Sequence, residues 1–160
     1  TGPVMMKSKI YIHQDANYES LSSDMSILAS QMILKALTLI EKKEDEYIPQ
    51  NEKAATYAKK INKQEAKINW QDTARTTIAK INAFHPNPGA WIYFKGSRIK
   101  LVKAKEIKLS GTPGKILKSN FTVACKENAI QILELKKEIK KKMLVSEFLK
   151  GNKINIGSQI

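Results

Sequence analysis

The sequence predicts an α+β chain whose C-terminal part is a small, open antiparallel β-barrel of the oligonucleotide-binding type. Three observations support this fold class. From Trp91 onward, apolar residues recur with a period of two in about five short runs. The alternation slips after Leu101 and after Ile132, where bulges would curl a sheet. A short helix that can cap the barrel precedes these runs. Residues 1–45 offer only one extended stretch and one long helix, too few elements to enclose a core of their own. A β-sandwich would give similar runs, so it remains an alternative.

The N-terminal elements follow from the same kind of pattern. Apolar residues alternate with lysines between Val4 and Ile12, which predicts a strand. Asn17 can cap a helix whose apolar residues, from Leu21 to Leu39, recur at intervals of three, four and seven. Residues 47–50 should be extended because proline disfavours helix in the residue before it. Residues 54–70 connect this part to the rest of the chain.

The elements of the C-terminal part follow in order. Asp72 or Thr73 can cap a helix that runs to Phe84 and ends at the segment His85–Gly89. A hairpin with its turn at Lys95–Ser97 comes next. The remaining predicted strands are residues 115–118, 121–125 and 129–135, and a short helix at residues 146–149 ends at Gly151.

The charge of the chain is concentrated in its second part. The net charge is +13, yet residues 1–52 hold five lysines and eight acidic residues, a net charge of −3. Residues 53–160 therefore carry a net charge of +16. Such a surplus favours polyanions, because it raises association rates and releases counterions from phosphates. A lysine-rich soluble surface would have the same composition, so charge alone leaves both interpretations open.

Two groups of lysines are the candidate RNA-binding residues. One group lies in the connecting segment, where the spacing of three of its members would align them on one side wherever the segment is helical. The other group forms the densest run of positive charge, after the last predicted strand. The candidates are Lys59, Lys60, Lys63 and Lys67 in the first group and Lys140, Lys141 and Lys142 in the second.

The sequence gives no support for chemistry within this chain. One cysteine and two distant histidines, His13 and His85, cannot form a metal site, and no phosphate-binding glycine loop or nucleophile elbow occurs. Cys125 is expected to be buried as a small apolar residue, and the absence of an intrachain disulfide suits a reducing cytosol. No run approaches the ~20 apolar residues of a membrane span, so no membrane partner is expected. We also expect a cytoplasmic monomer.

Several segments in a fixed order resemble the methionyl-tRNA formyltransferase family, and the similarity covers nearly the whole chain. The segments are Pro49-Gln50-Asn51-Glu52, Thr56-Tyr57-Ala58, Ile68-Asn69-Trp70, Ala83 to Trp91, Gly111 to Leu117, Lys140 to Met143 and Glu147 to Gly151. The resemblance implies that residues 1–45 are the last strands and helix of a Rossmann-like catalytic domain. Residues 46–70 would be a basic linker, and residues 71–160 a tRNA-binding barrel.

The resemblance also implies a reaction and its participants. The intact enzyme would transfer a formyl group from 10-formyltetrahydrofolate to the amino group of methionyl-initiator-tRNA, without a metal. Thr1-Gly2-Pro3 resembles the end of the family's DTGP motif, whose catalytic aspartate would precede this chain. The catalytic asparagine and histidine would also lie upstream, so no catalytic residue is assigned here. We expect this chain alone to be inactive.

Some positions depart from the family pattern, and two other functions remain to be weighed. His85 and Asn87 stand where the family usually has Asn and Trp, Lys59 replaces a frequent Pro, and Lys137 and Ile139 replace Pro and Gly. Sugar formyltransferases and formyl-folate hydrolases or dehydrogenases share parts of the pattern but need no such basic barrel. A free-standing RNA-binding module is the alternative from a different class.

Overall fold

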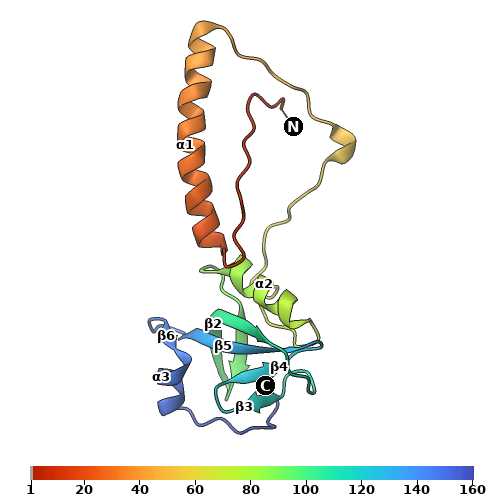
Figure 1. The fold of residues 1–160 in the computed structure, drawn as a ribbon, viewed down its shortest axis with the longest axis vertical. Coiled ribbons are helices and arrows are strands. Elements are labelled where there is room, and N and C mark those ends of the chain that lie inside the picture. The colour runs from red at the N-terminus through yellow and green to blue at the C-terminus, as the bar shows by residue number, and fades with distance from the viewer. Residues whose placement is uncertain (1) are drawn as a thin grey trace. The chain divides into compact units, whose positions relative to one another are not determined.

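The computed structural model describes residues 2–160, and the chain divides into two compact units (Figure 1). The first unit is Thr1–Lys60 and the second is Ile61–Ile160. Each unit is described by itself below.

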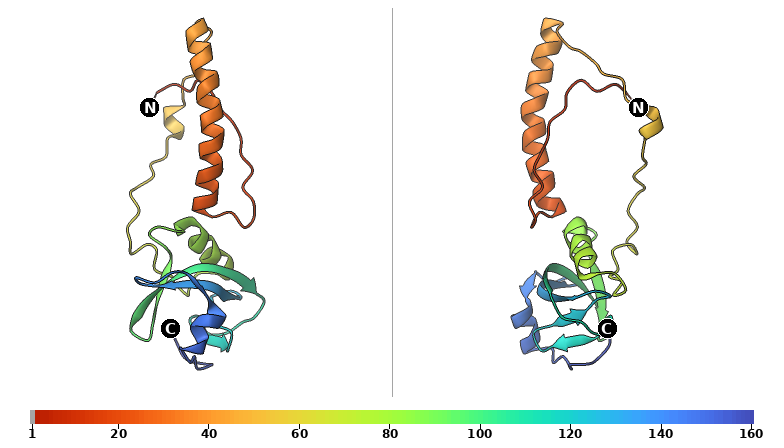
Figure 2. Two further views of the ribbon diagram at one scale, coloured as in Figure 1. Left: turned by 90° about the vertical axis from the view of Figure 1, so that its left-hand side faces the viewer. Right: turned by 45° about the vertical axis from the view of Figure 1, so that its right-hand side comes forward.

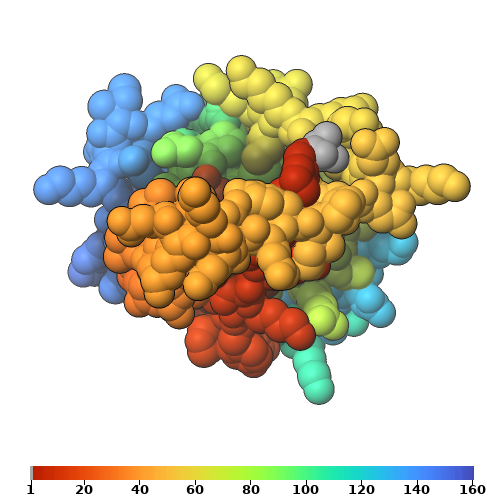
Figure 3. All heavy atoms as spheres, turned by 90° about the horizontal axis from the view of Figure 1, so that it is seen from above, coloured from red at the N-terminus to blue at the C-terminus, as the bar shows by residue number. Residues whose placement is uncertain are grey.

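The first unit is dominated by one long helix, α1 (Tyr18–Lys42), as the apolar spacing predicts. The side chain of Asn17 accepts a hydrogen bond from the Ser20 backbone N–H at 2.9 Å, which confirms Asn17 as the N-cap. The helix ends at Lys42, and its C-cap residue, Lys43, has a left-handed backbone. No residue of α1 is buried within the described chain, and Figure 3 shows one end of this unit as spheres, with the residues of the helix in orange.

This helix has the length and composition of a membrane-crossing segment. Its mean hydropathy reaches 1.2 over 18 residues, and it meets that test by length and apolarity alone. Core helices of soluble proteins have the same property. The sequence analysis expected no membrane-length run because it counted consecutive apolar residues, and Lys35 interrupts the longest such stretch.

The strand predicted between Val4 and Ile12 is wrong. The structure has only a single antiparallel bridge there, in which Val4 and Ile48 exchange two backbone hydrogen bonds of 2.9 and 3.0 Å. A strand needs neighbouring strands for its amide groups, and the described residues of this unit provide none beyond that bridge. The bridge does place Ile48 in extended backbone, as the proline after it predicts. A short 3₁₀ helix, η1 (Glu52–Ala54), follows.

The second unit is a curled antiparallel sheet with a helix at each side (Figure 2). The strands are β1 (Trp91–Phe94), β2 (Ser97–Ile107), β3 (Ile116–Lys118), β4 (Thr122–Ala124), β5 (Ala129–Lys137) and β6 (Met143–Leu144). Their order is β1-β2-β5-β4-β3, with β6 beside β5. The helices are α2 (Ala74–Phe84) and α3 (Val145–Lys150). This is the open antiparallel barrel that the sequence predicts, including its capping helix and closing helix.

The two slips in alternation are one irregularity in the structure. The register between β2 and β5 shifts between Leu101 and Ala104 on one strand, opposite Ile132 to Leu135 on the other. Each strand therefore carries one extra, unpaired residue in this region, and the original pairing register resumes at Ala104 and Ile132. Paired bulges of this kind increase local twist, which helps the sheet to curl.

The core lies inside the curl and is closed at one side by aromatic rings. Phe94, Phe121 and Phe148 are buried, with ring centroids 5.2 to 6.1 Å apart. Thr73 caps α2 by accepting a hydrogen bond from the Thr76 N–H, and Ile81 of this helix is fully buried in the core. Each fully buried aromatic or aliphatic side chain contributes about 1.5–3 kcal/mol, so this core can hold the unit together.

Both outer edges of the sheet are covered by chain segments that are not strands. Residues 66–68 run beside β1. The Ile68 N–H donates to the Trp91 carbonyl and the Trp91 N–H donates to the Ala66 carbonyl, both at 2.9 Å. At the other edge, residues 157–160 pair with β3 and the turn before it, through the Gly157 N–H to the Ile116 carbonyl at 2.7 Å and the Ile160 N–H to the Gly114 carbonyl at 3.0 Å. Unpaired edges invite association with other chains, and here they are protected.

Candidate nucleic-acid interface

The outward face of β1 and β2 is built around Trp91. This side chain is only 3% exposed although it lies outside the hydrophobic core cluster. The guanidinium carbon of Arg98 lies 4.2 Å from the centroid of the Trp91 ring, and the Lys67 ammonium lies 5.8 Å from it. The indole N–H donates to the Lys63 carbonyl at 3.1 Å. Trp91 is therefore buried under cations, an arrangement in which each cation–π interaction is worth about 0.5–2 kcal/mol.

The strand register collects further cations on the same face. Residues directly opposite in neighbouring strands point to the same side of a sheet. Trp91 is opposite Lys100, Lys100 is opposite Lys136, and Tyr93 is opposite Arg98. We call this surface the basic face; its members are Lys63, Lys67, Trp91, Tyr93, Arg98, Lys100 and Lys136.

The other cations of the basic face and partial burial change the pKa of Lys100. Its partial burial lowers the pKa of Lys100 below the ordinary 10.5, and the neighbouring charges of Arg98, Lys136 and Lys63 lower it further. Glu138 is the one carboxylate among the described residues that opposes this shift. A concentration of positive charge with so little compensation is a site for an anion. Phosphate oxygens between these groups would relieve the repulsion that the free protein carries.

Gly89 makes room for the stem of Lys100. This residue has a φ of 79°, in the left-handed region, and a Cβ atom placed there would lie 2.7 Å from the Lys100 Cδ. The loop from His85 to Gly89 closes by a hydrogen bond from the Gly89 N–H to the Phe84 carbonyl at 2.9 Å. The proline-rich loop after α2 thus supports the basic face.

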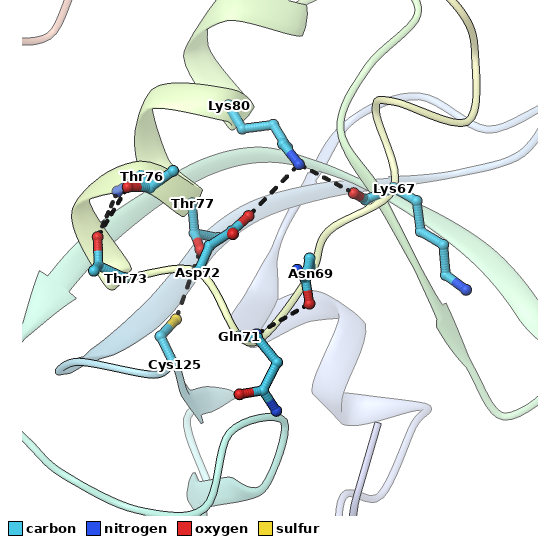
Figure 4. A network of polar contacts seen from close by, with 9 residues as sticks. All are labelled: Lys67, Asn69, Gln71, Asp72, Thr73, Thr76, Thr77, Lys80 and Cys125. Carbon is cyan, nitrogen blue, oxygen red and sulfur yellow. Dashed lines mark hydrogen bonds and ion pairs between the residues drawn. The ribbon is translucent and has the colours of Figure 1, made fainter.

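A network of polar contacts fixes the backbone of Lys67 beside β1 (Figure 4). The Lys80 ammonium donates to the Lys67 carbonyl at 3.5 Å and lies 3.6 Å from the Asp72 carboxylate. Asn69 accepts a hydrogen bond from the Gln71 N–H at 3.1 Å. The side chain of Lys67 points away from this network, toward the rings of the basic face. The connecting segment is therefore anchored at the point where it presents Lys67.

The predicted lysines are divided among three places. Lys63 and Lys67 belong to the basic face. Lys59 and Lys60 are exposed on an irregular segment of the first unit, and residues 55–62 form no helix, so the helical alignment of Lys60, Lys63 and Lys67 does not arise. Ala66 is buried where the chain turns onto β1, and this packing decides the conformation of the segment.

The second group of lysines occupies the turn between β5 and β6. Lys140, Lys141 and Lys142 are exposed there, and the Lys142 ammonium lies 3.8 Å from the Glu134 carboxylate. Ile139, at a position where the resembled family has glycine, is fully exposed with a φ of 67°. A β-branched residue in this region is strained. The turn begins at Glu138, two residues after Lys136, so it follows the basic face along the chain.

Sequence reasoning missed five members of the basic face. Trp91, Tyr93, Arg98, Lys100 and Lys136 were not among the predicted site residues, although Arg98 and Lys100 occupy alternate positions of a predicted strand. That alternation was a usable signal, since it places both cations on the polar side. The contribution of Lys136 depends on the pairing of β2 with β5, which no local pattern reveals.

The other reactive side chains are structural. Cys125 is buried as expected, with its sulfur 3.8 Å from the Thr77 hydroxyl, and burial raises the pKa of its thiol. His13 makes an edge contact with Tyr11, with ring centroids 4.8 Å apart. Among residues 2–160, no group of three histidine, cysteine or acidic side chains is placed to hold a metal ion.

Comparison with known proteins shows where the chain belongs. The protein-family model described as formyl transferase, C-terminal domain, matches residues 60–153. The methionyl-tRNA formyltransferase of Pelagibacter ubique is 37% identical over 161 residues, covering 100% of this chain and 52% of the relative. That of Bradyrhizobium diazoefficiens is 33% identical and covers 99% of this chain and 52% of the relative. The chain thus spans about half the length of these curated relatives.

A solved structure has the same fold. HypX from Aquifex aeolicus superposes with a TM-score of 0.65, covering 94% of this chain and 31% of that protein, at 22% sequence identity. At this identity the likeness concerns the fold. The family match over residues 60–153, more than half of the chain, establishes that the chain belongs to the formyl transferase C-terminal domain family.

Proposed function

We propose that this chain is the tRNA-holding part of a methionyl-tRNA formyltransferase that acts in the initiation of protein synthesis. The observation that carries the proposal is the basic face, where Lys63, Lys67, Arg98, Lys100 and Lys136 gather around two aromatic rings. The names of the curated relatives support the same function. A sugar formyltransferase or a formyl-folate hydrolase would leave this charge without a ligand, so these alternatives explain less.

The proposed division of labour follows the family pattern. Residues 1–45 belong to the catalytic domain, residues 46–70 are the linker, and residues 71–160 hold the tRNA. No catalytic residue is assigned within the chain. The exposed apolar side chains of α1 suit a helix that packs against the rest of such a domain. The protein works in the cytoplasm as a monomer, without a membrane.

The proposed reaction is an acyl transfer. The neutral amino group of methionyl-initiator-tRNA attacks the formyl carbon of 10-formyltetrahydrofolate. The bond between that carbon and the folate nitrogen breaks, the amino group loses one proton, and the folate nitrogen gains one. A positioned acid–base group and hydrogen-bond donors for the tetrahedral oxyanion supply the catalysis in reactions of this class. The residues described here contribute binding and orientation of the tRNA, because phosphate contacts fix the register of a nucleic acid on a protein.

The predicted contacts are tested by the salt dependence of tRNA binding. The RNA-binding residues proposed are Lys59, Lys60, Lys63, Lys67, Lys140, Lys141 and Lys142. Replacing Lys60 and Lys63 together by alanine should weaken binding to all tRNAs alike. It should also lower the slope of log affinity against log salt by about two units, because each lysine that no longer neutralises a phosphate removes about one. The matched control replaces Lys7 and Lys9, two exposed lysines near the N-terminus.

Fluorescence anisotropy with labelled initiator tRNA at several salt concentrations gives both quantities. An unchanged slope in the Lys60 and Lys63 double variant, equal to that of the control, would contradict the assigned contacts. A formylation assay with charged initiator tRNA completes the test: the 160-residue chain should bind tRNA and transfer no formyl group. Turnover by this chain would refute the assignment of the catalytic groups to another part of the protein.

A further inference from the structure

Tyr93 differs from its neighbours on the basic face because its ring is open to solvent. The side chain is 56% exposed, whereas Trp91, two residues earlier on the same strand, is 3% exposed under Arg98. Both rings point outward, away from the buried Ile92 and Phe94. An exposed ring on the middle of a strand is placed where a flat ligand can reach it.

The surroundings hold the Tyr93 ring in a defined orientation. Its centroid lies 5.2 Å from that of Trp91, with the ring planes at 83°, so the two rings meet edge to face. The Lys67 ammonium lies 5.8 Å from the Tyr93 ring centroid. A ring supported on one side by an aromatic neighbour and by a cation loses little freedom when a ligand stacks on it.

Two cations of the neighbouring strand β2 lie beside the Tyr93 ring. Arg98 lies directly across from Tyr93, and Lys100 lies across from Trp91 on the same face. Direct and diagonal neighbours in a sheet are separated by about 5–8 Å at Cβ. The Arg98 side chain is only partly buried, although its Nε atom is buried and makes no hydrogen bond among the described residues. The site therefore combines an aromatic ring for a base with cations for the adjoining phosphates.

We propose that Tyr93 is a stacking platform for an unpaired nucleotide of the bound tRNA, with Arg98 and Lys100 holding the flanking phosphates. The inference rests on the proposed function and specifies how one part of the RNA is held. Only an unpaired nucleotide can stack on the ring, because the bases of a duplex already stack on each other. The Tyr93 ring thus distinguishes single-stranded from double-stranded segments, while the cations bind both.

The test compares three substitutions of Tyr93 in the full 160-residue chain. Tyr93→Ala removes the ring, Tyr93→Leu keeps an apolar side chain without a π face, and Tyr93→Phe keeps the ring. The probes are a single-stranded oligoadenylate and an RNA duplex of the same length, both measured by fluorescence anisotropy. Tyr11→Ala is the matched control, because Tyr11 is 77% exposed and lies in the first unit.

Stacking on one aromatic residue predicts the size and the pattern of the change. Tyr93→Ala and Tyr93→Leu should each weaken single-strand binding by about 5- to 100-fold, with duplex binding and the salt slope unchanged because no charge is removed. Tyr93→Phe and Tyr11→Ala should bind the single strand as the unchanged chain does. Thermal melting of each variant confirms that the barrel is folded.

Other results would overturn the inference. Single-strand affinity within twofold in both Tyr93→Ala and Tyr93→Leu would show that no base stacks there. If Lys136→Ala still weakened tRNA binding in that case, the proposed function would stand and only the stacking role would fall. If the unchanged chain failed to bind any RNA but bound phosphatidylserine vesicles, the inference and the proposed function would both fall.

Discussion

Replacing Arg98 tests whether the cations of the basic face also stabilise the fold. In Arg98→Ala, the Trp91 ring no longer has the guanidinium that lies 4.2 Å from its centroid. If about a quarter of the roughly 200 Å² that a tryptophan buries becomes accessible, the newly exposed area is about 50 Å². At ~25 cal/mol per Å² this costs about 1.2 kcal/mol. Removal of the cation–π interaction costs about 0.5–1 kcal/mol, but relief of the repulsion between Arg98 and Lys100 offsets it, so the unfolding free energy should fall by about 1.2 kcal/mol.

Arg98→Met separates packing from charge. Methionine keeps an unbranched apolar stem over Trp91, so most of the area term is retained. Removing the positive charge also relieves its repulsion of Lys100, which helps to lower the pKa of that lysine. These effects offset the absence of the cation–π interaction, and the expected change in stability is within about 0.5 kcal/mol. Both variants remove one cation, so each should lower the salt slope of tRNA binding by about one unit.

Urea unfolding followed by tryptophan fluorescence measures the stability of all three proteins. The reasoning predicts a clear difference between the alanine and methionine variants in stability and none in the salt slope. Equal destabilisation by both substitutions would refute the area term and assign the effect to charge. A decrease of less than about 0.5 kcal/mol in Arg98→Ala would refute the covering role of Arg98 altogether.

Two further predictions concern the barrel itself. Gly114 has a φ of 83°, and an added Cβ would lie 3.0 Å from the Ile160 carbonyl oxygen, so Gly114→Ala should lower the unfolding free energy, measured in urea, by about 2–4 kcal/mol. Gly96 has a φ of 74° with open space around it, so Gly96→Ala should lower it by only the ~1 kcal/mol of the backbone conformation. Equal destabilisation of the two variants would exclude a steric contact with residues 157–160. Because burial raises the pKa of the Cys125 thiol above 9.0, the unfolded chain releases its proton first, and stability should fall as pH rises above about 9. Cys125→Ala should lack this part of the pH dependence, and a slope that persists in that variant would assign it to other groups.

Local patterns predicted the elements whose causes are local. The cap at Asn17, the cap at Asp72 or Thr73 and the hairpin turn at Lys95–Ser97 each depend on a few adjacent residues, and all three are found, with Thr73 as the cap of α2. The paired bulges were also visible, because an inserted residue shifts the alternation of both strands. The strand expected at Val4–Ile12 failed because alternation shows a suitable surface, while a strand also needs a partner for its backbone.

The candidate site was only partly predictable for a related reason. Density of charge identified the lysines of the connecting segment and the turn after β5, since density is a property of the sequence. The basic face depends on the pairing of β2 with β5 and on the segment that lies beside β1. These contacts join residues far apart in the chain. Lys136 gains its role only because it lies opposite Lys100.

The covering of β3 by residues 157–160 has a consequence for the protein while it is being made. The ribosome releases the chain from its N-terminal end, and the strands β1 to β6 emerge before these residues do. Until residues 157–160 are synthesised, Ile116 and Gly114 lack the partners that the finished barrel gives them. The nascent sheet therefore has an open edge until residues 157–160 emerge, and an open edge can pair with another chain.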